Sequence, residues 1–233
     1  MGRYILHSDV VWVDRPDGSC RLLHMGRKTF ALRPDTAAWL RSVLAEGASP
    51  ASADPAVAPL LRERLVLDVA RPRARVGAVK AICASALVER ALRRAERARS
   101  RPGRARRLLH VARGATAVFG WAETVRVWER HYRQPSGAPP PCRQDLEVID
   151  ETVRLVAARS LAGHECKERA LACLALARSS GVAAELVVGI SEPPLRAHVW
   201  VEAGGTVVSD DADSCRRYDR VARYTGTGTL VPP

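Results

Sequence analysis

The chain has 233 residues, of which 47% are apolar, and this is enough to build one large hydrophobic core or two smaller ones. No stretch approaches the roughly 20 uncharged apolar residues of a membrane-spanning helix, and residues 1–9 lack the apolar core of a signal peptide, so we expect a cytoplasmic protein. The net charge of +12 is concentrated in residues 71–133, where 17 Lys and Arg face four Glu and the local net charge is +13.

Residues 1–70 combine strand-like and helical patterns. A helix that Asp35 caps and Gly47 ends is expected after the strands, and a second, short helix is expected before an apolar run at residues 65–67. Three strands followed by short helices predict a small winged-helix-like unit. The strands are expected at residues 4–13, 20–24 and 28–32, and the short helix at residues 58–64.

Residues 71–142 are predicted to be helical and basic. Apolar residues recur there at helical spacing, while arginines fill the other faces. Pro102-Gly103 interrupts the pattern, and a second helical stretch continues to about Arg133. Pro-rich residues 134–141 predict a stiff linker. We expect this basic helical segment to pack on the domain that follows it.

In residues 143–233 the pattern changes from helical to mixed helix and strand, and it predicts an α+β domain. Two helices are expected first, and an antiparallel meander of strands follows them. The helices are expected at residues 146–159 and 165–178, and the strands at residues 184–190, 197–202 and 206–209.

Six cysteines occur without any Cys-x-x-Cys pair, so neither a disulfide framework nor a zinc ribbon is expected. Cys166 differs from the others because it lies in the first turn of a predicted helix. Unpaired backbone N–H groups and the positive end of the helix dipole favour a thiolate there, and the thiolate is the nucleophilic form of cysteine. His164 and Cys215 fit no common zinc spacing, and we expect no metal and no cofactor.

His198 begins a predicted strand whose hairpin partner ends at Asp210-Asp211. A three-residue loop, Ala203–Gly205, would place His198 opposite Asp210 in the hairpin. A two-residue Gly-Gly turn would pair His198 with Asp211 instead, because each one-residue slip exchanges the two faces of a strand. Either register supplies a carboxylate that can orient the imidazole.

The order of Cys166, His198 and the carboxylate, with the cysteine on a helix N-terminus, resembles the transglutaminase-like cysteine hydrolases. The spacings resemble one branch of them, the B proteins of lasso-peptide biosynthesis, which are leader peptidases. The matching segments are Cys166-x-x-Arg169-Ala170-Leu171, Leu186–Ile190 and Ala197–Glu202. The resemblance implies a transglutaminase-like, papain-like cysteine protease domain at residues 143–233, and it favours Asp210 as the third catalytic residue.

The first 70 residues resemble the small domain, related to pyrroloquinoline-quinone peptide chaperones, that recognises leader peptides in such pathways. In that family the leader adds a strand to a sheet edge. The resemblance therefore implies a leader-recognition domain at residues 1–70. In the other domain, Trp200 shares a strand face with His198, and we expect it either to line the catalytic cleft and contact substrate or to pack as a core aromatic. The implied leader-binding residues are Lys28, Thr29, Phe30, Ala31 and Leu32, together with Leu61 on the short helix.

The resemblance implies acyl transfer to Cys166 at the leader–core junction, with His198 moving the proton and Asp210 orienting the imidazole. The backbone N–H of Cys166 is expected to help stabilise the oxyanion. The expected partners are the precursor peptide and the ATP-dependent, asparagine-synthetase-like cyclase of lasso pathways.

Two other functions are compatible with the sequence. The same fold can serve an amidase or acyltransferase that acts on another substrate. The Arg-rich segment is typical of a solvated helix surface, of a face that docks an acidic partner, or of a non-catalytic adaptor that binds nucleic acid. Because no aromatic residues alternate with these arginines, we expect no nucleic acid partner.

Overall fold

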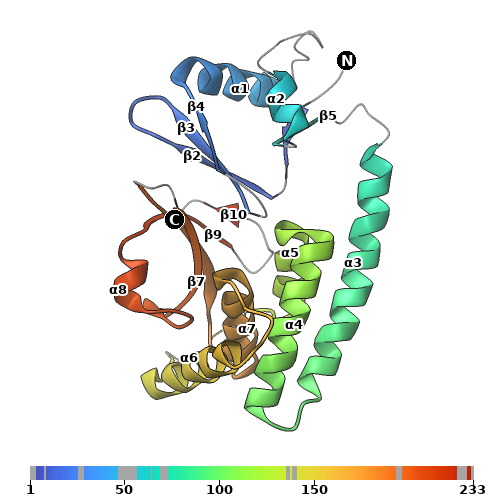
Figure 1. Cartoon of the computed structure of the whole chain (residues 1–233), viewed down its shortest axis with the longest axis vertical. Coiled ribbons are helices and arrows are strands. Elements are labelled where there is room, and N and C mark those ends of the chain that lie inside the picture. Colours follow the sequence, from blue (N-terminus) through green and yellow to red (C-terminus); the bar gives the residue numbers. More distant parts are fainter. Residues whose placement is uncertain are drawn as a thin grey trace. The chain divides into compact units, whose positions relative to one another are not determined.

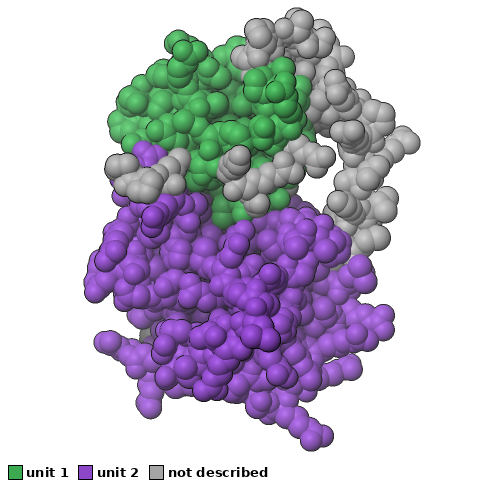
Figure 2. Space-filling model, viewed as in Figure 1, with its two compact units in different colours: residues 1–83 green, residues 84–233 purple. Residues whose placement is uncertain are grey.

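The computed structural model describes residues 4–7, 9–25, 29–46, 57–63, 65–68, 73–134, 137, 141–192, 196–224 and 230–231. The chain forms two compact units, Met1–Cys83 and Ala84–Pro233 (Figure 2). The division falls within a helix, whereas the sequence predicts three segments, 1–70, 71–142 and 143–233. That three-part organisation stays a prediction.

The first unit contains two small antiparallel sheets and two helices. Its larger sheet has the order β2-β3-β4, and a second sheet pairs β1 with β5. Buried residues from both sheets and both helices, including Leu22, Leu40 and Leu65, form one core. The elements are β1 (Tyr4–Leu6), β2 (Val10–Asp14), β3 (Cys20–His24), β4 (Thr29–Leu32), α1 (Pro34–Glu46), α2 (Val57–Arg62) and β5 (Val66–Asp68).

The predicted strand over residues 4–13 is wrong as a single element. Its first part, β1, pairs with β5, and its second part, β2, pairs with β3 in the other sheet. The chain turns between them, where the N–H of Val10 donates to the carbonyl of His7. The unit mixes helix and sheet, and its winged-helix-like character stays a prediction.

Among the residues that the structure describes, the second unit begins within a long helix and holds five more. They are α3 (Arg73–Glu96), α4 (Arg101–Phe119), α5 (Trp121–His131), α6 (Arg143–Ala158), α7 (Cys166–Ser179) and α8 (Ala212–Cys215). Pro102 lies in the first turn of α4, and the Ser100 side chain caps that helix by accepting from the N–H of Gly103. The predicted continuous helix to Arg133 is wrong, because Gly120, with φ 89°, separates α4 from α5.

A five-stranded antiparallel sheet completes the second unit. It consists of β6 (Glu185–Ser191), β7 (Arg196–Ala203), β8 (Thr206–Val207), β9 (Asp219–Tyr224) and β10 (Leu230–Val231). The order β10-β9-β6-β7-β8 makes β6 the central strand. The predicted meander lacks β9, which returns along the other edge of β6 and is tied to α5 by a hydrogen bond from Trp121 Nε1 to Tyr224 Oη at 2.8 Å.

Helix α7 packs against β7 and β6 on one side and against α4 and α6 on the others (Figure 1). Residues 170–178 are all buried, as expected for a helix that is apolar on every face. Arg178 is the exception in this apolar environment. Its guanidinium donates to the buried carboxylate of Glu129 on α5, to the carbonyl of Tyr132 and to the carbonyl of Ala184.

The side chains of Arg178 and Glu129 are both fully buried. Burial raises the pKa of Glu129 to about 7, and the hydrogen bond from Arg178 opposes this effect. A buried cation is tolerated only when its donors are paired. Arg178 therefore fixes the C-terminal end of α7 against α5 and against the residues that precede β6.

We expect Arg178→Met to lower the free energy of unfolding by about 3–5 kcal/mol, because it leaves Glu129 and two buried carbonyls without their donor. Urea denaturation followed by circular dichroism measures the change. Arg216→Met is the matched control, since Arg216 pairs with Asp213 on the surface, and its loss should cost under about 1 kcal/mol. Equal effects of the two substitutions would contradict this account of Arg178.

Candidate active site

Cys166 is the first residue of α7, as the sequence predicts. Glu165 precedes it as the N-cap, and the Glu168 carboxylate accepts from the backbone N–H of Glu165, as in a capping box. The backbone N–H of Cys166 is one of the helix-terminal donors that have no carbonyl partner within the helix. Cys166 as a residue is only partly buried.

His198 lies on β7 directly opposite Gly189 of β6. Its ring stacks on Tyr218, with 5.0 Å between centroids, and on Trp200, with 5.8 Å between centroids. Gly189 makes this arrangement possible, because a Cβ there would lie 2.6 Å from the Trp200 ring and 2.8 Å from Tyr218 Cβ. The glycine is therefore required for space beside the imidazole.

Asp210 provides the carboxylate that contacts His198. The distance from His198 Nε2 to Asp210 Oδ2 is 3.0 Å. Asp211 has a different role, because its side chain accepts from the N–H of Ser214 and caps α8. Of the two carboxylates considered from the sequence, Asp210 is thus the one beside the imidazole.

The three-residue loop that would place Asp210 opposite His198 in the hairpin is nevertheless wrong. β7 and β8 are joined by a two-residue Gly204-Gly205 turn, which pairs Ala203 with Thr206. Beyond β8, the N–H of Val208 still donates to the carbonyl of Val201, but the N–H of Val201 donates to the Ser209 hydroxyl in place of a backbone carbonyl. Because a side chain replaces a backbone acceptor here, the residues that follow need not alternate between the two faces of the sheet. Asp210 therefore contacts His198 without being its partner in the ladder.

Electrostatics favours a thiolate–imidazolium pair in this site. Burial opposes ionisation of Cys166, but hydrogen bonds from His198 and from the backbone N–H of Val199 lower the pKa of this thiol. Burial also disfavours charge on His198, yet hydrogen bonds with Asp210, Cys166 and Cys215 raise its pKa to about 12. The hydrogen bond from His198 lowers the pKa of Asp210 against its burial. The three groups can therefore carry alternating charges at neutral pH.

Three neighbours of these residues were not assigned to the site from the sequence. Cys215, which ends α8, and Tyr218 both contact His198. Arg169 on α7 lies 3.2 Å from Asp210, measured from Nη2 to Oδ2. Only Arg169 has a signal in the sequence, since it shares a helix face with Cys166 at i, i+3 spacing.

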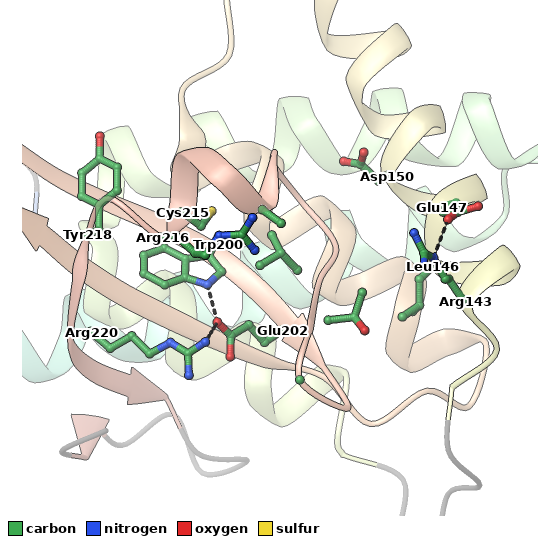
Figure 3. Close-up of a pocket in the computed structure, with 14 residues that line it drawn as sticks. Arg143, Leu146, Glu147, Asp150, Trp200, Glu202, Cys215, Arg216, Tyr218 and Arg220 are labelled. Atoms are coloured by element: carbon green, nitrogen blue, oxygen red, sulfur yellow. Dashed lines mark hydrogen bonds and ion pairs between the residues drawn. The ribbon is translucent and has the colours of Figure 1, made fainter.

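Trp200, predicted to line a cleft, is buried and lines a pocket of about 700 Å³ (Figure 3). The residues that line this pocket do not include Cys166, His198 or Asp210. Its Nε1 donates to Glu202 at 2.7 Å, and Glu202 pairs with Arg220 at 2.8 Å. Cys215 and Tyr218 line the same pocket. A substrate side chain that entered this pocket would therefore lie against the residues that hold the imidazole.

The predicted leader-binding residues belong to the first unit, whereas the three catalytic candidates belong to the second. Lys28 lies outside the described residues. Thr29–Leu32 form β4, which is at an edge of its sheet and pairs only with β3 among the described strands. Phe30, Leu32 and Leu61 pack against the core of the unit, and Ala31 is exposed.

Over the part of the chain that the structure describes, no three His, Cys, Asp or Glu side chains are grouped so that they could hold a metal ion. The described helices include none with the length and apolar character needed to cross a membrane.

Comparison with known families gives a match over the second unit. The sequence model of the transglutaminase-like superfamily matches residues 108–223, which begin within α4 and end within β9. This range includes Cys166, His198 and Asp210, and it shows that the chain contains a transglutaminase-like domain. Searches of curated proteins and of solved structures give no match. The domain fits a cysteine peptidase or an acyltransferase.

We expect iodoacetamide to alkylate Cys166 at pH values below the usual thiol range, because its lowered pKa leaves a thiolate there. In His198→Ala the pH–rate curve should move to higher pH, since the thiolate loses its hydrogen-bonding partner. Peptide mass spectrometry follows the label on each cysteine. The exposed Cys142 is the internal reference in both samples, and an unshifted curve for Cys166 would remove His198 from its proposed role.

We expect Gly189→Ala to destabilise the second unit by about 1–3 kcal/mol and to slow alkylation of Cys166, because the added methyl overlaps Trp200 and Tyr218. Thermal denaturation and the same labelling experiment measure the two effects. Gly114→Ala is the matched control, since no atom lies within 4 Å of its Cβ position and alanine is the better helix former. If both alanines behave alike, the packing explanation fails.

Proposed function

Starting from this transglutaminase-like domain, we propose that the protein is a cysteine peptidase that removes the leader from a lasso-type ribosomal precursor peptide. Cleavage would precede macrolactam formation. The observation that supports it best is the contact of His198 with both the Cys166 thiol and the Asp210 carboxylate, with the cysteine at a helix N-terminus. This arrangement suits hydrolysis through an acyl-enzyme.

The proposed reaction has two steps. The Cys166 thiolate attacks the carbonyl carbon at the leader–core junction, and the imidazolium of His198 gives its proton to the departing core amine as the peptide bond breaks. Water then attacks the thioester, with His198 as the base, and releases the leader as a carboxylic acid. Asp210 keeps the imidazole oriented and stabilises its charged form throughout. The N–H of Cys166 is directed at the developing oxyanion.

The leader is proposed to bind the first unit. β4 has a free edge among the described strands, and an extended peptide can add to such an edge through backbone hydrogen bonds. Leu61 on α2 and Phe30 on β4 offer apolar contacts beside the unit's core. Holding the leader on the same chain as Cys166 would raise the effective concentration of the scissile bond.

Cleavage produces a core peptide with a free α-amine, which is the nucleophile that macrolactam formation consumes. We therefore propose the ATP-dependent, asparagine-synthetase-like cyclase of such pathways as the functional partner. Arg90, Arg94, Arg106 and Arg107 of α3 and α4 are exposed, and none of them forms an ion pair with a described acidic residue. They offer a face for an acidic surface of that partner.

The decisive experiment is a mass-spectrometric cleavage assay on the precursor peptide, with and without the cyclase. We expect the native protein to cut at one junction and both Cys166→Ala and His198→Ala to lose cutting by at least about 10³-fold, because each removes part of a unit that acts together. Cleavage by Cys166→Ala would overturn the mechanism. Transfer of the leader to an added amine, with little free acid, would make the protein an acyltransferase instead.

Leu61→Glu should raise the KM for the precursor about tenfold or more and leave kcat unchanged, because the substitution places a charge where the leader is proposed to lie. Initial rates over a range of peptide concentrations separate the two constants. Val118→Glu introduces the same charge on an exposed position of α4 and should leave both constants unchanged. A fall in kcat alone would contradict leader binding at α2.

A further inference from the structure

Arg169 and His198 converge on the same oxygen atom. Arg169 Nη2 lies 3.2 Å and His198 Nε2 lies 3.0 Å from Oδ2 of Asp210. The other oxygen, Oδ1, accepts from the backbone N–H of Asp211 at 2.9 Å. The carboxylate thus has three donors, and Arg169 is the only one of them on α7.

Pairing with β7 does not fix this carboxylate, although the N–H of Asp211 binds one of its oxygens. The last backbone hydrogen bond to β7 runs from the N–H of Val208 to the carbonyl of Val201, and the Asp210 side chain is 20% exposed. A carboxylate after the end of a strand can rotate about two side-chain bonds unless contacts hold it. A guanidinium from a buried helix is well suited to hold it, because its donors are planar and rigidly arranged.

We propose that Arg169 is a positioning residue, which holds Asp210 in the orientation that His198 requires and thereby supports the thiolate of Cys166. Arg169 follows Cys166 by one helical turn, so the nucleophile and the anchor of the carboxylate move together with α7. The proposal rests on the proposed catalytic role of Cys166, although it does not depend on the nature of the peptide substrate.

Arg169 affects the interaction between His198 and Asp210 in two opposing ways. Its positive charge competes with His198 for the carboxylate, whereas its hydrogen bond keeps the carboxylate within reach of His198. The proposal requires the second effect to be the larger one. Other charged groups beside this cluster include Asp150 and Arg154 on α6, Asp211 before α8 and Lys167 next to Cys166. Burial raises the pKa of Asp150 to about 6.

The test compares Arg169→Met, Arg169→Lys and a control, Arg154→Met, in the full chain. Arg154 lines the same small pocket but is 60% exposed and pairs with Glu151. The rate of Cys166 alkylation by iodoacetamide is measured from about pH 5 to about pH 9, which needs no peptide. We expect Arg169→Met to react about tenfold more slowly near pH 6, equivalent to a rise of about one pKa unit in the thiol.

Arg169→Lys should recover part of the rate, because an ammonium group can donate to Oδ2 without the planar fork. Arg154→Met should match the native protein. A curve for Arg169→Met that superimposes on the native curve, or that moves toward faster reaction, would overturn the proposal. Thermal denaturation accompanies each variant, and the lysine variant carries the test if the methionine variant does not fold.

A double-mutant cycle separates positioning from a general structural effect. If Arg169 acts through Asp210, then adding Arg169→Met to Asp210→Asn should slow alkylation by less than about twofold more, since the shared interaction is already lost. An equal tenfold loss in both backgrounds would show that Arg169 acts independently and would refute the proposal. Native-like alkylation without peptide cleavage would instead refute the proposed substrate and leave the positioning role standing.

Discussion

The burial of α7 is the constraint on which the rest of the second unit depends. A helix with no solvent-facing side over residues 170–178 can occupy only the space that α4, α6 and the sheet leave for it. Its C-terminal end is fixed by Arg178, whose donors satisfy buried acceptors on α5 and before β6. Its N-terminal end, which carries Cys166, is fixed as a consequence.

The charged groups of the site form a series of side-chain contacts that begins and ends on α7. Cys166 contacts His198, His198 contacts Asp210, and Asp210 contacts Arg169. Each group has a neighbour of opposite charge when the thiol is ionised, and this arrangement offsets the cost of burial at each position. A shift of β7 relative to α7 would break two of these contacts together, so the same interactions align the site and join the helix to the sheet.

Local signals in the sequence were sufficient to place Cys166 at a helix N-terminus and insufficient for the surroundings of this residue. The predicted helix at residues 165–178 placed Cys166 in its first turn, and α7 begins at this residue. The sequence left the turn of this hairpin open, because a three-residue and a two-residue loop containing Gly204-Gly205 differ by one residue in register, and the structure has the two-residue turn. Asp210 reaches His198 although the predicted pairing does not exist, since Ser209 replaces a backbone acceptor and ends the ladder. Such a replacement depends on the tertiary path of the chain and has no periodic pattern.

The sequence does not predict the strand β9 for a related reason. Its residues Asp219, Arg220 and Arg223 are charged, so it lacks an apolar pattern, and it pairs with β6, which is distant in the sequence.

The rings around His198 show why this site conflicts with stability. Trp200 and Tyr218 remove water from one side of the imidazole and thereby disfavour its charged form, which Asp210 must then restore. Apolar residues of similar volume in place of Cys166, His198 and Asp210 would avoid this desolvation cost altogether. Gly189 adds a second cost, because a glycine within a strand is less stable than a residue that packs there. The sequence retains both the buried charged group and the glycine, and they are paired: His198 lies directly opposite Gly189 in the β6–β7 ladder. Local rules of stability are broken at this point of the sheet, and this is where a catalytic role explains the residues better than a structural one.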